Sequence, residues 1–338
     1  MEKYSFFLYA ALLLSGCSST QPFFNEGLVY PGGSKTYVPI APSEKNLSNV
    51  VAEPYFEVSK ETLALESPVF DKQGNLYFVS VYEGRIYKLT PERNISVFYE
   101  EKGFFPGGIA ITKDGDFVAA NVGDFKSGTV TLIGNNGKKI RDLLSAKENL
   151  VPDDLVIDKY GGIYFTDFRG SSTDLQGGIY YLNPVDGGFK PLLKNMSAPN
   201  GIALSPNGKV LWATEFGNSR LHRIELGEPG KIGRYGSSIP YHFVGKGPDS
   251  MRTDVDGNVY VVMYGQGRIM VFDSEGLPIG QILLPGRTDG KFLKVASLII
   301  DHQSRDMYIV ARDELKKHGS WIFKSKAFAQ GTRLYSHQ

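Results

Sequence analysis

Residues 198–208 read APNGIALSPNG, a short apolar run that is introduced by Pro-Asn and closed by an Asn-Gly turn. Such a turn between runs rich in β-branched and aromatic residues is typical of a β-hairpin. The chain repeats the pattern, usually as Asp, Ser or Thr followed three residues later by Gly. The turns begin at Asp71, Thr112, Asp158, Ser205 and Asp254, and a weaker copy begins at Asp301.

The period of this repeat predicts the fold. Successive turns lie 41 to 49 residues apart, and a four-stranded propeller blade takes ~40–50 residues. The sequence therefore predicts an all-β protein, a six-bladed β-propeller over residues 53–338. A strand near residues 54–60 is expected to complete the last blade and close the ring, which removes exposed sheet edges.

The N-terminal segment differs from the rest of the chain. Lys3 is followed by the apolar run FFLYAALLL and then by LSGC, which ends at Cys17, the only cysteine. The run is too short to span a bilayer, and LSGC resembles the lipobox of bacterial lipoproteins. We predict a lipoprotein signal peptide over residues 1–16 and a lipidated Cys17 at the start of a flexible tether over residues 17–52.

The predicted location follows from that leader. A lipidated protein would be held in the cell envelope, at the outer membrane or the periplasmic face of a Gram-negative host. The alternative is an ordinary secretory signal with an incidental cysteine. The single cysteine excludes an internal disulfide and a cysteine-rich zinc site.

The charge balance bears on partners. The 338 residues include 37 Lys and Arg against 36 Asp and Glu, a net charge of +1. A nearly neutral chain gives no electrostatic case for a nucleic-acid partner. We expect a monomer that acts on a small molecule.

In four of the six blades, one position of the repeat has a residue with a carboxylate or amide oxygen in its side chain. Five residues before each turn stand Glu66, Gly107, Asp153, Asn200, Asp249 and Ala296. This is the predicted start of the innermost strand, where equivalent positions meet on the axis. Three converging carboxylates require a compensating cation. Oxygen ligands without His or Cys favour Ca²⁺, or Mg²⁺ or Mn²⁺, over Zn²⁺.

The sequence leaves a second interpretation open for the oxygen-bearing residues and for a set of aromatic residues. The oxygen-bearing residues could instead cap the inner strands beside a water-filled channel. An aromatic residue also follows the second strand of five blades, at Tyr82, Phe125, Phe168, Phe216 and Tyr264. These rings would line a pocket for a ring-shaped, partly apolar substrate, or they would pack between adjacent blades.

Several segments resemble one known family. They include FDKQGNLYFVSVYEGRIYKL, FTDFRG, GGIYYLNP, APNGIALS, SRLHRIEL and GPDS, spread from about residue 63 to residue 290. The chain resembles the senescence-marker-protein, gluconolactonase and luciferin-regenerating-enzyme family, and within it the branch of drug-responsive lactonases. The resemblance implies a calcium-dependent hydrolase that opens lactone rings.

The resemblance also implies ligands and a catalytic group. Glu66, Asp153, Asn200 and Asp249 match the family's calcium ligands, and Ser250 matches a further ligand of the drug-responsive branch. That branch also binds a second calcium, which we do not expect here because the DFKS segment is one residue shorter. The expected mechanism has Ca²⁺ polarise the lactone carbonyl while Asp249 assists proton transfer.

Two other functions remain possible on the sequence. One is phosphotriester or organophosphate hydrolysis at the same metal site, which relative turnover would distinguish. The other is a non-catalytic ligand-binding propeller, which the absence of metal from the purified protein would favour.

Overall fold

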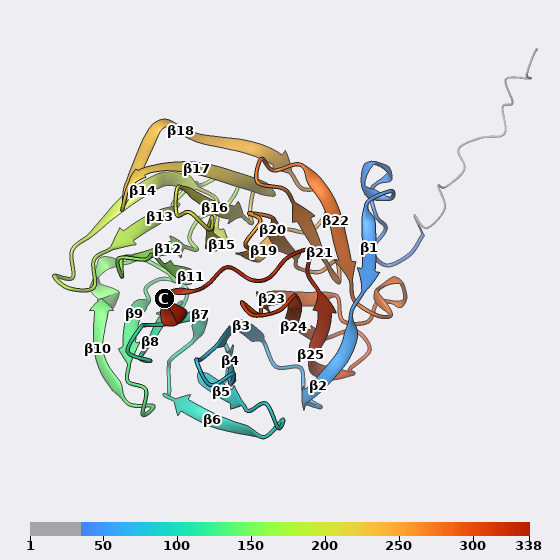
Figure 1. Cartoon of the computed structure of the whole chain (residues 1–338), viewed down its shortest axis with the longest axis horizontal. Coiled ribbons are helices and arrows are strands. Elements are labelled where there is room, and N and C mark those ends of the chain that lie inside the picture. The colour runs from blue at the N-terminus through green and yellow to red at the C-terminus, as the bar shows by residue number, and fades with distance from the viewer. Residues whose placement is uncertain (1–34) are drawn as a thin grey trace, which may run out of the picture.

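The computed structural model describes residues 35–338, which form six sheets arranged around one central axis (Figure 1). The predicted all-β, six-bladed propeller is therefore confirmed. The predicted leader and Cys17 lie outside the described residues. In the described part, no helix is long and apolar enough to cross a membrane.

The first three blades are continuous in sequence, and each runs outward from the axis. The first blade contains β3 (Leu65–Phe70), β4 (Leu76–Ser80), β5 (Arg85–Leu89) and β6 (Ile95–Glu100). The second contains β7 (Pro106–Ile111), β8 (Phe117–Asn121), β9 (Thr129–Ile133) and β10 (Lys139–Leu144). The third contains β11 (Pro152–Ile157), β12 (Ile163–Asp167), β13 (Gly177–Leu182) and β14 (Phe189–Met196). Neighbouring strands within each blade are antiparallel.

The fourth blade is also continuous in sequence, whereas the fifth and sixth blades each gain a strand from the N-terminal part of the chain. The fourth blade contains β15 (Pro199–Leu204), β16 (Val210–Glu215), β17 (Arg220–Glu228) and β18 (Lys231–His242). The fifth contains β19 (Pro248–Thr253), β20 (Val259–Met263), β21 (Arg268–Phe272), β22 (Pro278–Leu283) and β1 (Ser48–Val51). The sixth contains β23 (Lys294–Ile300), β24 (Asp306–Asp313), β25 (Gly319–Lys326) and β2 (Glu53–Ser59). Short 3₁₀ turns lie at Pro42–Glu44, Ala146–Glu148, Arg287–Asp289 and Tyr335–His337.

The repeated turn has the geometry that its sequence predicts. In the first blade, Oδ1 of Asp71 accepts hydrogen bonds from the backbone N–H groups of Gln73 and Asn75. The fourth residue of the turn at Ser205 is Gly208, whose φ of 69° suits glycine best. Each turn lies between the innermost and second strands, so all the turns share one face of the propeller.

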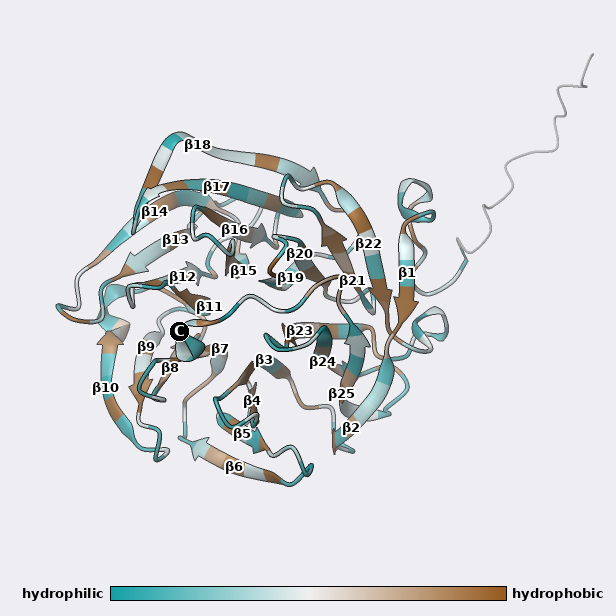
Figure 2. Cartoon of the chain, in the orientation of Figure 1, coloured by the Kyte–Doolittle hydropathy of each residue, from teal (hydrophilic) through white to brown (hydrophobic). Residues whose placement is uncertain are grey.

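Apolar side chains pack between neighbouring blades. Trp212 of the fourth blade, for example, lies in one cluster with Val259, Val261 and Phe272 of the fifth. Along the outermost strands, such as β10 and β18, hydrophobic and hydrophilic residues are mixed, as Figure 2 shows. Burying both faces of each sheet in this way holds the blades at fixed angles around the axis.

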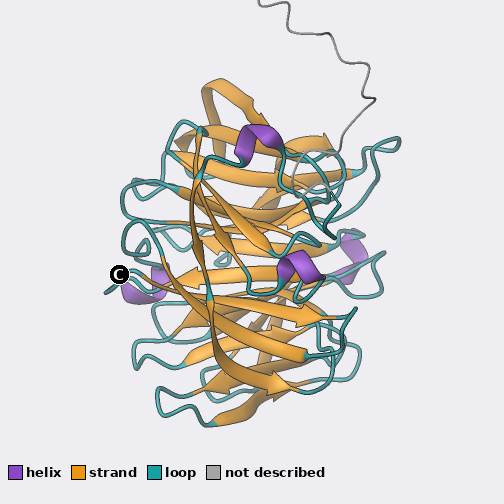
Figure 3. Cartoon of the chain, turned by 90° about the vertical axis from the view of Figure 1, so that its right-hand side faces the viewer, coloured by secondary structure: helices purple, strands orange, loops and turns teal. Residues whose placement is uncertain are grey.

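Strands from the N-terminal and C-terminal parts of the chain, β2 and β25, meet in the last blade. β2 pairs antiparallel with β25, which confirms the predicted closing strand. The C-terminal segment then crosses the turn face, where the Thr332 hydroxyl donates to the carbonyl of Asp254 and His337 contacts the carbonyl of Asp71. Figure 3 shows this segment on one side of the propeller.

The folded body begins earlier than the predicted boundary at residue 53. β1 adds to the fifth blade by pairing parallel with β22. Just before it, the buried carboxylate of Glu44 lies 2.7 Å from the buried Arg268 guanidinium and accepts a hydrogen bond from the Tyr241 hydroxyl. The end of the predicted tether is thus part of the structure, because a buried Arg268 requires a counter-ion.

Replacing Glu44 should therefore destabilise the propeller. We expect Glu44→Ala to lower the free energy of unfolding by about 3–5 kcal/mol, because it leaves Arg268 buried without its partner. Urea denaturation measures the change. The control is Glu228→Ala, which removes an exposed pair with Lys231 and should lower the free energy of unfolding far less, because water screens exposed ion pairs. Equal losses for the two variants would contradict this role for the ion pair.

Candidate functional site

Each innermost strand contains a β-bulge near its start. The pairing with the second strand slips after Glu66 in β3, after Pro106 in β7, after Pro152 in β11, after Pro199 in β15, after Pro248 in β19 and after Val295 in β23. A bulge bends the strand and changes the direction of its side chains. All the predicted oxygen donors lie at such bulges, so the bulge is the local device that directs them.

The first bulge also requires an unusual backbone conformation. Ser67, which follows Glu66, has a φ of 45°, a region that few residues other than glycine adopt. Its hydroxyl accepts a hydrogen bond of 2.8 Å from the backbone N–H of Ile109 in the next blade. Contact with a neighbouring blade therefore holds the strained residue in place.

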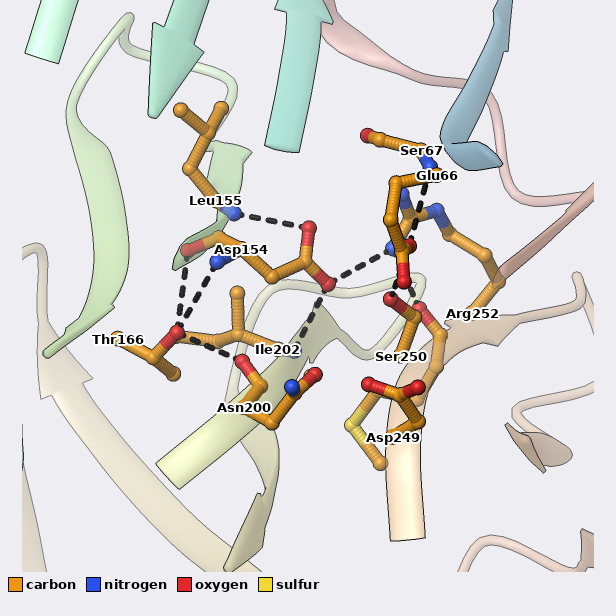
Figure 4. Close-up of polar contacts among 12 residues, drawn as sticks. Glu66, Ser67, Asp154, Leu155, Thr166, Asn200, Ile202, Asp249, Ser250 and Arg252 are labelled. Carbon is orange, nitrogen blue, oxygen red and sulfur yellow. Dashed lines mark hydrogen bonds and ion pairs between the residues drawn. The ribbon is translucent and has the colours of Figure 1, made fainter. Parts of the chain in front are cut away.

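The donors from different blades lie close together on the axis. Figure 4 shows Glu66, Asn200, Asp249 and Ser250 turned toward one region. The Ser250 hydroxyl donates to Oε2 of Glu66 over 3.4 Å. In the second blade, a Cβ on Gly107 would clash with Oδ1 of Asp153. Because Gly107 has no side chain, the Asp153 carboxylate can occupy the space beside it.

The carboxylates repel one another. Removal from water raises the pKa of Glu66 well above its ordinary value, and the charges of Asp249, Asp153 and Asp154 raise it further. The pKa of Asp249 is raised by burial and then by Asp153 and Asp154, while Arg312 opposes the shift. Burial and Asp154 raise the pKa of Asp153 to about 7. The site is therefore short of positive charge.

The donor chemistry fits a hard cation. Three carboxylates, an amide and a hydroxyl are oxygen ligands of the kind that Ca²⁺ takes. Within residues 35–338, however, no three His, Cys, Asp or Glu side chains are already grouped at metal-ligand spacing. The assignment of Glu66, Asp153, Asn200, Asp249 and Ser250 as ligands therefore stays a prediction.

An ion pair that the repeat pattern does not reveal lies directly beside the donors. Asp154 is buried, lies 3.2 Å from Nη1 of Arg252, and accepts hydrogen bonds from the backbone N–H groups of Leu155 and Ile202 (Figure 4). The signal was present as the second aspartate of VPDD. Only the first aspartate falls on the repeat position, so counting alone passed over its neighbour.

Two threonines join the inner strands of adjacent blades. The Thr166 hydroxyl accepts from the backbone N–H of Asp154 and donates to the carbonyl of Asn200. In the next blade, the Thr214 hydroxyl accepts from the N–H of Gly201 and donates to the carbonyl of Asp249. Each threonine thus fixes two bulged strands relative to one another. In the sequence, both bridges can be recognised by a Thr followed by Asp or Glu at the end of the second strand.

The residue after each threonine supports the same region. Asp167 accepts a hydrogen bond from the N–H of Val151, and Glu215 accepts one from the N–H of Ser197. Both contacts lie just before an inner strand. Asp167 also pairs with Arg169, and Glu215 with His222. These carboxylates hold the loops that lead into the donor positions.

The predicted aromatic residues fall into two groups. Phe168, Phe216 and Tyr264 form a row, with ring centroids 6.1 and 6.3 Å apart. Tyr82 and Phe125 are exposed at 65% and 50%. Phe168, Phe216 and Tyr264 therefore contact one another across adjacent blades, as one alternative expected, while their lining of a substrate pocket stays a prediction.

Arg312 is a further residue that the sequence did not indicate. It donates to the Tyr264 hydroxyl over 2.9 Å and pairs with Glu314 over 2.8 Å. Its charge lowers the pKa of Asp249, so it faces the donors from the sixth blade. That blade has Ala296 at the donor position, and its contribution to the site is a cation.

The sequence matches known proteins over most of its length. The profile of the SMP-30/Gluconolactonase/LRE-like region matches residues 65–310. The chain is 42% identical over 314 residues to lactonase drp35 of Staphylococcus saprophyticus, covering 91% of this chain and 97% of that protein. It is 43% identical over 316 residues to lactonase drp35 of Staphylococcus aureus, covering 92% and 97%.

Solved structures share the fold at low identity. A luciferin-regenerating enzyme aligns with a TM-score of 0.68 and 18% identity, covering 84% of this chain and 99% of that one. Regucalcin of Agrobacterium tumefaciens, described as a calcium-binding protein, aligns with a TM-score of 0.70 and 18% identity, covering 85% and 99%. These alignments support the propeller architecture.

The raised pKa values predict how stability depends on pH. The pKa of Asp153 is about 7 in the folded protein against 3.8 ordinarily, so its stabilising contribution is complete below about 3.8 and is lost as the pH rises through 7. Without divalent cations, the free energy of unfolding should fall over that range. Urea denaturation of chelator-treated protein at pH 5 and pH 8 measures the fall.

The control for this prediction changes Asp153 alone. Asp153→Asn should reduce the difference in stability between pH 5 and pH 8. Added Ca²⁺ should stabilise the unsubstituted protein more at pH 8 than at pH 5, because protons compete with the ion for the carboxylates. A stability that rises with pH in both proteins would contradict the predicted repulsion.

Proposed function

This chain belongs to the SMP-30/gluconolactonase/LRE-like family, and we propose that it is a calcium-dependent hydrolase that opens lactone rings. The staphylococcal relatives named as lactonases, more than 40% identical over nine-tenths of the chain, support the substrate class. The observation that carries the proposal is the meeting of repelling carboxylates with an amide and a hydroxyl on the propeller axis.

The residues that would hold the ion come from four blades, and each provides a side-chain oxygen. They are Glu66, Asp153, Asn200, Asp249 and Ser250. A bound Ca²⁺ supplies a Lewis acid that polarises the lactone carbonyl. Mg²⁺ or Mn²⁺ could replace it, since both also prefer oxygen ligands. The similarity in fold to a calcium-binding regucalcin is consistent with this choice.

We assign the proton transfer to Asp249. Its carboxyl is buried and faces both the other donors and Arg312. In this role it takes a proton from the attacking water and returns it to the ring oxygen that leaves. The threonine bridge from Thr214 to the carbonyl of Asp249 keeps the strand, and with it the carboxylate, in position.

The aromatic row suits a cyclic substrate. Phe168, Phe216 and Tyr264 follow the second strands of adjacent blades, on the face where the donors lie. Their rings offer apolar surface to a lactone and limit the access of water to the site.

The leader carries a separate proposal about location. We propose that Cys17 is lipidated and holds the protein in the cell envelope, because LSGC ends an apolar run at the only cysteine. The described chain begins on the donor face, where the carbonyl of Val38 accepts a hydrogen bond of 2.8 Å from Arg287.

The direct test measures lactone hydrolysis by the full-length protein. We expect hydrolysis with Ca²⁺, loss after a chelator, and a fall of about 10²–10⁴-fold in kcat for Asp249→Asn, because general acid–base catalysis contributes that much. The matched control is Asp124→Asn, an exposed aspartate that caps a loop, which should change kcat little.

Two results would contradict the proposal. Full activity of Asp249→Asn would remove this residue from the chemistry. Faster turnover of a phosphotriester than of any lactone would assign the same site to the alternative hydrolase. Metal content, measured by mass spectrometry, shows whether Asp249→Asn has lost the ion or only the proton transfer.

The threonine bridge gives a second prediction. Thr214→Val removes hydrogen bonds to Gly201 and Asp249 without changing the size of the side chain. We expect Ca²⁺ affinity, measured by calorimetry, to fall about tenfold or more, as for groups that orient metal ligands. Thr131→Val is the control, since this buried threonine bonds Asp142 in the second blade. Unchanged affinity in Thr214→Val would refute the positioning role.

A further inference from the structure

A cavity of about 660 Å³ occupies the propeller axis at the end opposite the donors. Its walls are the later residues of the inner strands, such as Ile111, Ile157 and Ile300, together with the turn face. Leu334 and Tyr335 of the C-terminal segment close it from outside. The volume lies within the ~300–1,000 Å³ of small-molecule sites.

Six side chains, one from each blade, form a ring at the inner end of this cavity, and five of them are aliphatic. Three residues beyond each donor position, five blades carry an aliphatic residue and the fifth blade carries Arg252. All six residues line the cavity: Val69, Ala110, Val156, Ala203, Arg252 and Ile299. The inner end of the cavity is therefore apolar except for a single guanidinium.

The guanidinium of Arg252 is only partly used by the protein. Its side chain is 12% exposed, and Nη1 donates to Oδ2 of Asp154 over 3.2 Å and to the carbonyl of Met251 over 2.6 Å. In the part of the chain that the structure describes, Nε and Nη2 make no hydrogen bond. A guanidinium carries five N–H donors in a planar fork, so one edge is available to a second carboxylate.

We propose that this cavity is a second ligand site, separate from the lactone site, that binds a medium-chain aliphatic carboxylate. The carboxylate meets the unused edge of Arg252, and the chain lies along the aliphatic walls. The outer part of the lining has charges of both signs, with cations in slight excess: Lys159, Lys209 and Arg333 against Asp158 and Glu228. This site goes beyond the proposed lactone hydrolysis and does not depend on it.

Calorimetry with sodium octanoate tests the proposal on the full-length protein. We expect one octanoate to bind per chain, and octanol and acetate to bind at least tenfold more weakly. Arg252→Met with Asp154→Asn should weaken octanoate binding at least tenfold, since it removes the cation without leaving Asp154 charged and unpaired. Ala110→Leu, which keeps Arg252 and fills part of the cavity, should weaken it as well.

The matched control is Arg169→Met. Arg169 also pairs with an aspartate, Asp167, but it does not line the cavity, so octanoate binding should be unchanged. The proposal is overturned if octanoate does not bind, if octanol binds equally well, or if Ala110→Leu binds octanoate like the unsubstituted protein. Because Ala110→Leu leaves both charges in place, the test holds even where the double variant does not fold.

Discussion

Closure of the ring is the constraint on which the rest of the structure depends. The antiparallel pairing of β2 with β25 joins the N-terminal part of the body to its last blade. Once six blades share one axis, equivalent positions of every inner strand are brought together, whatever side chains they carry. The donors at Glu66, Asp153 and Asp249 meet for this reason, although more than 180 residues separate the first from the last.

That meeting is energetically unfavourable for the carboxylates taken alone. Burial raises the pKa values of all three, and the charge of Asp154 beside them raises them further. The protein nevertheless holds them in place through bulged strands, the bridges of Thr166 and Thr214, and the capping contacts of Asp167 and Glu215. Such support for an unfavourable cluster is expected where a bound cation repays the repulsion.

The axis has two chemically different ends. At one end lie the oxygen donors of the inner-strand starts, with the aromatic row and Arg312 from the ends of the second strands. At the other end, the later residues of the inner strands surround an aliphatic cavity. The Asp154–Arg252 ion pair lies between them. A single set of inner strands thus presents different chemistry at its two ends, because successive positions along each strand face different stretches of one channel.

Much of this could be read from the sequence. Hairpin turns at a regular spacing determined the number of blades, and a fixed offset from each turn determined the donor positions, because local turn chemistry and strand register follow from neighbouring residues. Asp154, Thr166, Arg252 and Arg312 could not be assigned in this way. Their roles depend on partners in other blades, as does the inclusion of Glu44 in the folded body. Only the closed tertiary structure decides which distant groups share a low-dielectric interior, where an unpaired charge or hydrogen bond is costly.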